Sequence, residues 1–132
     1  MKVIVDTNLL VRIITNDDKN QAKAARDLLK QAELMVLPTA TLCELCWVLT
    51  RAYGLDNQTL AKVISGLVGA ANSAVDTDAV TIGLKVLASG GDFADGAIAA
   101  TGRQAGGEQF VTFDHQAARL VAKAGMPSQL LD

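Results

Sequence analysis

The sequence predicts an α/β fold, with a central, mostly parallel sheet of about four to five strands flanked by helices. Short apolar runs that read as buried strands alternate with longer amphipathic segments of helical periodicity. No two of these runs are joined by the two-residue turn that is typical of a β-hairpin. Strands that alternate with helices in this way favour a parallel sheet with a helical layer on each face.

Each element has its own signal, taken in chain order. "KVIV" at Lys2–Val5 is a β-branched strand, and "DTNLLVRIIT" after it is a helix that Thr7 or Asn8 could cap. Residues 16–33 form a helix with Ala22, Ala25, Leu28 and Leu29 on its apolar face, and residues 34–38 form a second strand that ends at Pro38.

The second half of the pattern begins with a helix at residues 39–54, which Gly54 ends and whose inner stripe is Leu42, Cys46, Leu49 and Tyr53. Three more helices follow at residues 56–70 (capped by Asp56 or Asn57), 76–91 and 92–106. "QFVTFD" at residues 109–114 is a clear strand, residues 115–125 are the last helix, and residues 127–132 are expected to be a tail.

The length and the net charge limit which classes of protein are possible. The chain has 132 residues and no linker or repeat, so residues 1–132 are expected to form one domain. A formal net charge of −2 gives no overall positive field that would attract nucleic acid, although a local basic rim or bound metal ions could still bind it. Two cysteines, and the lack of a signal peptide or membrane span, predict a cytoplasmic protein.

Five acidic residues are predicted to face one rim of the sheet. Asp6 and Asp114 follow strands, Asp92 and Asp95 open a helix, and Glu44 is the one charged residue between positions 34 and 50. Ligand sites of open α/β sheets lie beyond the carboxyl ends of the strands. A buried Glu44 would need a cation or an arginine beside it, with Arg51 and Arg12 as candidates. All-oxygen ligands select Mg²⁺, Mn²⁺ or Ca²⁺, which favours phosphodiester chemistry.

Several of these residues could have a structural role instead. An aspartate at a strand end or helix start is commonly a cap, and His115, the single histidine, suits a solvated helix start. The pair Cys43 and Cys46 lacks the further ligands of a zinc site, so we expect it to pack in the core. No phosphate-binding loop, dinucleotide fingerprint or nucleophile elbow is present.

Four ordered segments resemble a known family. "VIVDTNLLVRII", the lone glutamate after the second strand, "DFADGAIAATG" and "FVTFDHQAARL" are similar to PIN domains, specifically the VapC-type toxins of bacterial toxin–antitoxin pairs. The resemblance spans nearly the whole chain and implies a PIN-like three-layer sandwich. Gly96 departs from the alanine that the family usually carries.

The resemblance also implies a function. Asp6, Glu44, Asp95 and Asp114 would be the catalytic, metal-binding acids of a Mg²⁺-dependent (or Mn²⁺-dependent) ribonuclease, and Asp92 would be a further metal ligand. Thr7, Asn8 and Thr112 would be supporting polar residues. Water would attack an RNA phosphodiester and leave a 3′-hydroxyl and a 5′-phosphate. The implied partners are RNA, a cognate antitoxin and a second copy of the chain.

Two other functions stay open at this point. One is a PIN-fold module that binds without catalysis, which would be expected to lose its acids. The other is a metal-dependent phosphatase, for which Asn8 stands where a second aspartate would be wanted. Phosphate contacts could come from any of seven basic residues, namely Arg12, Lys19, Lys23, Arg51, Lys85, Arg103 and Arg119.

Overall fold

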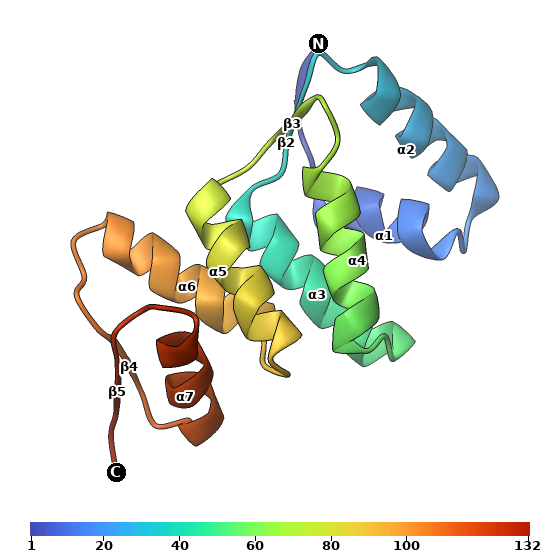
Figure 1. Cartoon of the computed structure of the whole chain (residues 1–132). Helices are drawn as coiled ribbons and strands as arrows, with labels where there is room; N and C mark the ends of the chain where they lie inside the picture. The colour runs from blue at the N-terminus through green and yellow to red at the C-terminus, as the bar shows by residue number, and fades with distance from the viewer. The chain divides into compact units, whose positions relative to one another are not determined.

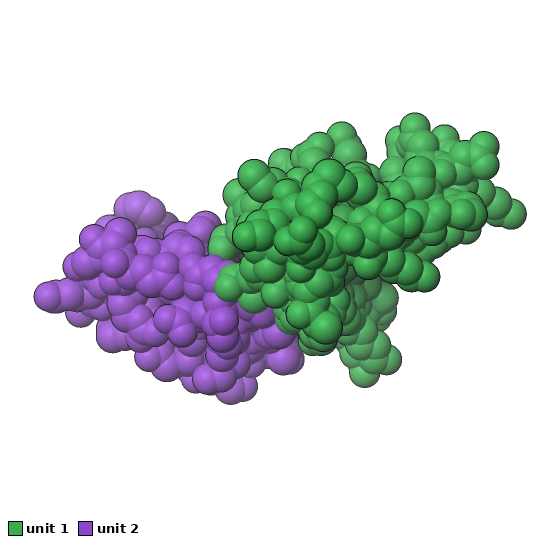
Figure 2. All heavy atoms as spheres, turned by 90° about the horizontal axis from the view of Figure 1, so that it is seen from above, with its two compact units in different colours: residues 1–75 green, residues 76–132 purple.

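The computed structural model describes residues 1–132 and divides them into two compact units, residues 1–75 and 76–132 (Figure 2). Seven helices and five strands confirm the α/β class, and every strand pair is parallel. The strands pair as one three-stranded and one two-stranded sheet. The expectation that the whole chain is one domain stays a prediction, and each unit is described below by itself.

The N-terminal unit contains a parallel sheet of order β1-β2-β3. Lys2 pairs with Leu34 and Met35 pairs with Ser73, which fixes the register. The elements are β1 (Lys2–Ile4), α1 (Thr7–Thr15), α2 (Lys19–Gln31), β2 (Leu34–Val36), α3 (Thr39–Tyr53), α4 (Asn57–Val68) and β3 (Ser73–Ala74). Since β1 and β2 are parallel neighbours, α1 and α3 both begin at the carboxyl edge of this sheet (Figure 1).

The C-terminal unit contains the parallel pair β4-β5, with Phe110 opposite Ser128. Its elements are α5 (Thr77–Ala88), α6 (Phe93–Gln104), β4 (Phe110–Thr112), α7 (His115–Lys123) and β5 (Ser128–Leu130). Helices α5 and α6 pack closely on each other, and α7 contacts both of them (Figure 1). Phe93, at the start of α6, is fully buried, as are Leu87 on α5 and Leu120 and Val121 on α7.

Helices α5 and α6 approach each other at two glycines. A Cβ atom on Gly96 would lie 2.6 Å from the carbonyl oxygen of Ile82 and 2.8 Å from the Cα of Gly83. A Cβ atom on Gly83 would lie 2.6 Å from the ring of Phe93. Gly96, which looked like a small departure from the family pattern, therefore allows backbone-to-backbone contact between the two helices.

Two strands were not predicted. Ser73–Ala74 in β3 has no β-branched residue, and its position is set by Asn72, whose side-chain amide donates to the carbonyl oxygens of Leu29 and Ala32 at 3.0 Å each. Ser128–Leu130 in β5 lies in the segment expected to be a tail. The prediction that residues 127–132 form a tail is wrong, because Ser128–Leu130 pairs with β4. Both strands are too short to carry a periodic signal in the sequence.

Two residues placed on apolar stripes are exposed. Leu28 and Tyr53 keep 37% and 38% of their surface in solvent, whereas Ala22, Ala25 and Leu42 are buried as predicted. The Tyr53 hydroxyl donates to Asp17 at 2.6 Å, which keeps its polar end at the surface. None of the seven helices combines the length and the apolar character that crossing a bilayer requires.

Candidate functional site

The five predicted acids divide between the two units. Asp6 and Glu44 belong to the N-terminal unit, and Asp92, Asp95 and Asp114 belong to the C-terminal unit. Within neither unit do three acidic, histidine or cysteine side chains lie close enough together to hold a metal ion by themselves. The acids of each unit are therefore described separately.

In the C-terminal unit, Asp92 and Asp95 occupy the start of α6. Asp92 is the N-cap, and its Oδ1 accepts a hydrogen bond from Ala94 N–H at 3.1 Å. Asp95 lies three residues further, in the first helical turn, and its own N–H donates to the Asp92 carbonyl at 3.1 Å. Residues three apart on a helix are neighbours on its surface, so the two carboxylates are close.

Asp114 joins them from the start of α7. It is the N-cap of that helix, and its Oδ1 accepts from Ala117 N–H at 3.0 Å. Its own N–H donates to the hydroxyl oxygen of Thr112 at 3.0 Å, at the end of β4. Thr112 thus fixes the turn that carries Asp114 from the strand into the helix.

Asp95 shows the electrostatic strain of this arrangement. Its side chain is half-buried, and burial raises its pKa above the usual aspartate value, with the negative charges of Asp92 and Asp114 raising it further. No protein donor hydrogen-bonds its carboxylate to offset this. A cation bound at the Asp95 carboxylate would relieve both the repulsion and the lost solvation.

In the N-terminal unit, Asp6 caps α1. Its Oδ1 accepts from Thr7 N–H at 2.9 Å, so Asp6 is the cap and the prediction of Thr7 or Asn8 in that role is wrong. The reason is that Asp6 already has the extended backbone that a cap needs, while Thr7 is helical and buried. Asn8 is exposed on the second residue of the helix.

Glu44 is brought toward the same edge of the sheet by α3. The hydroxyl of Thr41 donates to the carbonyl oxygen of Val5 at 3.1 Å, which ties the first turn of α3 to the residue between β1 and Asp6. Glu44 lies three residues after Thr41, on the same face of the helix. The sequence analysis did not identify Thr41. Its position one helical turn before Glu44 is the only sequence feature that indicates a role near the site.

The expectation that Glu44 is buried is wrong. It is exposed, because the helical repeat turns Leu42, Leu45 and Cys46 inward and carries Glu44 and Trp47 outward. Neither proposed arginine pairs with it. The Arg51 guanidinium lies 4.2 Å from the centroid of the Trp47 ring, and Arg12 Nε donates to Gln21 Oε1 at 2.8 Å. The carboxylate remains open to solvent or to a cation.

Helix capping does not separate the functional acids from ordinary ones. Six of the seven helices have an aspartate N-cap, and these are Asp6, Asp18, Asp56, Asp76, Asp92 and Asp114. The competing interpretation as a helix cap thus holds for three of the five candidates, and it does not account for Asp95 or Glu44. Of these two, only Asp95 is half-buried and therefore costly to keep ionised without a cation.

The cysteines and the histidine contribute no ligands to this set. Cys46 is buried, like Leu45 and Leu49 on the same helix, which agrees with its predicted place in the core, while Cys43 is half-buried; no disulfide joins them. His115 is exposed at the first position of α7. The donor set is made of carboxylates alone, which fits a hard divalent cation such as Mg²⁺ or Mn²⁺.

Comparison with known proteins agrees with this chemistry. The model of the PIN domain family matches residues 3–123, which is nearly all of the chain. Searches for a similar curated protein and for a similar solved structure returned no match. The α/β fold with five parallel strands is consistent with the PIN fold. The chain belongs to the PIN domain family, whose members are typically metal-dependent nucleases.

Proposed function

We propose that this protein is a Mg²⁺- or Mn²⁺-dependent RNA endonuclease, and that it acts as the toxin of a toxin–antitoxin pair. The observation that carries the nuclease role, in a chain of the PIN family, is the half-buried Asp95 carboxylate at the start of α6, which has no hydrogen-bond donor and lies near the negative charges of Asp92 and Asp114. Burial, and then the negative charges of Asp92 and Asp114, disfavour the ionised form of Asp95 unless positive charge is bound. A phosphodiester nuclease of this family needs such a cation.

The proposed ligands are Asp6, Glu44, Asp95 and Asp114, with Asp92 as a further one. Asp6, Asp92 and Asp114 each use Oδ1 to cap a helix, which leaves Oδ2 without a backbone donor and fixes the side-chain orientation. Asp95 and Glu44 use neither oxygen in capping. When bound, a hard divalent cation supplies the Lewis acidity that activates water and stabilises the negative charge at the phosphodiester.

The chain's own residues hold and orient this set. Thr112 accepts the Asp114 N–H, and Thr41 anchors the turn of α3 that precedes Glu44. Asn8 and Thr7 follow Asp6 directly, and the exposed Asn8 amide is available to the substrate. Cleavage would leave a 3′-hydroxyl and a 5′-phosphate. A cytoplasmic location, a cognate antitoxin and a homodimer complete the proposal, and their support is the resemblance of the four sequence segments to VapC-type toxins.

The test uses conservative variants with a matched control. Asp6→Asn and Asp114→Asn keep a capping oxygen but remove a charge, and Asp56→Asn makes the same change at the cap of α4, outside the acid set. Each protein is freed of bound partner by unfolding and refolding, then incubated with total RNA and Mg²⁺. We expect cleavage by the wild type and by Asp56→Asn, and a loss of at least a hundredfold in the other two.

Two results would count against the proposal. Equal cleavage by all four proteins would identify a contaminating nuclease. No cleavage by refolded wild type that has regained its native circular dichroism would leave a non-catalytic binding module as the better reading of the fold.

A further inference from the structure

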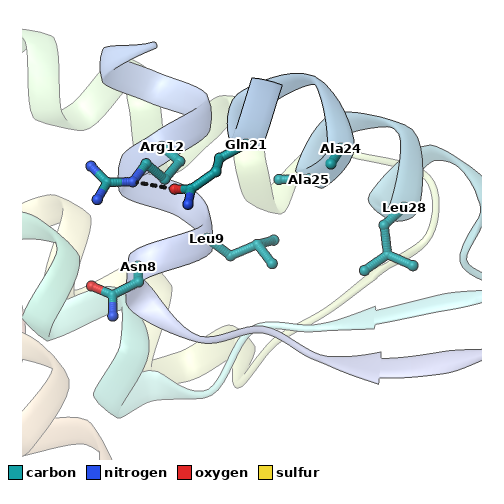
Figure 3. Close-up of a pocket in the computed structure, with 7 residues that line it drawn as sticks. All are labelled: Asn8, Leu9, Arg12, Gln21, Ala24, Ala25 and Leu28. Atoms are coloured by element: carbon teal, nitrogen blue, oxygen red, sulfur yellow. Dashed lines mark hydrogen bonds between the residues drawn. The ribbon is translucent and has the colours of Figure 1, made fainter. Parts of the chain in front are cut away.

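A cavity of about 570 Å³ lies between α1 and α2, wholly inside the N-terminal unit (Figure 3). Its walls are apolar and come from both helices, with Leu9 on α1 and Ala24, Ala25 and Leu28 on α2. The volume is in the range of pockets that take small organic ligands. The exposure of Leu28 shows that the cavity opens to solvent.

Arg12 lies at one end of the cavity, and only one of its guanidinium nitrogens, Nε, donates a hydrogen bond within the protein. Arg12 Nε donates to Gln21 Oε1 at 2.8 Å, and in Figure 3 the two terminal nitrogens point away from this bond. The ion pairs of the chain join Met1 to Glu33 and Lys23 to Asp27, so no carboxylate is paired with Arg12. Arg12 is the one charged residue in the lining, which makes the cavity suited to an anion.

The polar groups of the lining, Asn8, Arg12 and Gln21, lie together at one end of the cavity (Figure 3). Because Gln21 Oε1 accepts from Arg12, the Gln21 side chain has its amide nitrogen left to offer a ligand. Asn8 adds a second amide on the α1 side, two residues after Asp6. A planar heterocycle with ring nitrogens and carbonyl oxygens at its edge matches apolar walls bordered by such donors.

We propose that this cavity holds one nucleotide of the RNA, with the base between the walls of Leu9 and Leu28 and a phosphate on the Arg12 guanidinium. The proposal rests on the proposed function, because α1 carries both the cavity and, at its start, Asp6. A protein segment could also fill an apolar cavity, but an arginine with no acidic partner and two amides at the rim favour phosphate and base edges.

RNA binding is measured without divalent metal ions, so that cleavage cannot contribute. A fluorescently labelled RNA hexamer of mixed sequence is titrated with protein in EDTA and followed by anisotropy. Arg12→Ala removes the cation, and Ala24→Trp fills the cavity from an exposed position without changing charge. Lys62→Ala removes an exposed cation from α4 of the same unit as the control. We expect roughly tenfold weaker binding for the first two variants and less than a twofold change for the third.

Salt dependence separates the two roles within the cavity. Loss of one phosphate contact lowers the slope of log affinity against log salt by about 0.7 for single-stranded nucleic acid. Arg12→Ala should show this change, and Ala24→Trp should weaken binding with the wild-type slope. Circular dichroism and urea unfolding check that each variant is folded.

The outcomes separate this inference from the nuclease proposal. If RNA is cleaved with Mg²⁺ but Arg12→Ala and Ala24→Trp bind the hexamer as the wild type does, the cavity inference is overturned and the nuclease proposal stands. If both variants lose binding while the wild type cleaves nothing, the cavity inference stands and the nuclease proposal fails. No wild-type binding at all would overturn the nucleotide assignment and leave the cavity to a protein partner.

Discussion

The contact between α5 and α6 predicts different effects of the same substitution at two glycines of one helix. Gly96→Ala places a Cβ atom 2.6 Å from the Ile82 carbonyl oxygen and 2.8 Å from the Gly83 Cα. Both are backbone atoms, so neither can move aside as a flexible side chain would. Gly102→Ala, also on α6, meets nothing within 4 Å.

The magnitude follows from two terms. Replacing glycine by alanine in a helix stabilises it by about 1 kcal/mol at either position. Overpacking a rigid contact costs about 1–3 kcal/mol, and this cost applies to Gly96 alone. Because the helix term is common to both variants, the difference in their unfolding free energies should equal the overpacking cost, about 1–3 kcal/mol, with Gly96→Ala the less stable.

Urea unfolding followed by circular dichroism measures both variants against the wild type. The midpoint should rise for Gly102→Ala and fall relative to it for Gly96→Ala, with unchanged slopes. Since Gly96 adjoins Asp95, the Gly96→Ala protein should also lose cleavage activity, while Gly102→Ala keeps it. Equal stabilisation of the two variants would refute the close approach of α5 and α6.

Three further predictions concern charge and burial. Asp95→Asn should raise the melting temperature in EDTA by a few degrees: the pKa of Asp95 is raised in the folded state, so its ionised form at neutral pH costs stability, by less than about 1 kcal/mol because the side chain is half-exposed. Adding Mg²⁺ should stabilise the wild type and not this variant, and an Asp95→Asn protein that melts below the wild type would contradict the crowding. Asp76→Ala should cost about 1 kcal/mol at pH 7 through loss of the α5 cap. Because hydrogen bonds from the Ala79 N–H and then the Gln104 amide lower the Asp76 pKa, this stabilisation is present above the usual aspartate pKa and is lost as the pH falls through the lowered value. A stability difference from the wild type that persists unchanged at acid pH would refute this prediction. The double variant Cys43→Ser, Cys46→Ser should keep metal-dependent cleavage with about 1–3 kcal/mol less stability, since a hydroxyl replaces a buried thiol at position 46; a folded but inactive double variant would contradict the packing role.

Much of the fold was accessible from the sequence because its signals are local. The strands at β1, β2 and β4 are short apolar runs, and the helices carry clear caps and apolar faces. The strands β3 and β5 were missed because two or three residues without a β-branched pattern become strands only through their neighbours. Tertiary contacts such as Asn72 with α2 decide them, and no sequence window contains both partners.

The candidate site shows the same division. Asp92, Asp95 and Asp114 were identified from their positions after strands and at helix starts, and in the folded chain the charges of Asp92 and Asp114 act on Asp95. Glu44 is the one charge in its apolar stretch, as the sequence shows, but it is exposed rather than buried, since an apolar stretch does not say which face of the helix a residue occupies. The partners of Arg12 and Arg51 depend on rotamers and neighbouring elements, so composition could not supply them.

The most direct test of the metal-dependent nuclease is the cleavage rate of a labelled RNA as a function of Mg²⁺ concentration, for the wild type and Asp95→Asn. We expect a saturable dependence on Mg²⁺ for the wild type, no activity in EDTA, and a loss of at least a hundredfold for Asp95→Asn at every concentration. Cleavage by Asp95→Asn at the wild-type rate, or wild-type cleavage that persists in EDTA, would contradict it.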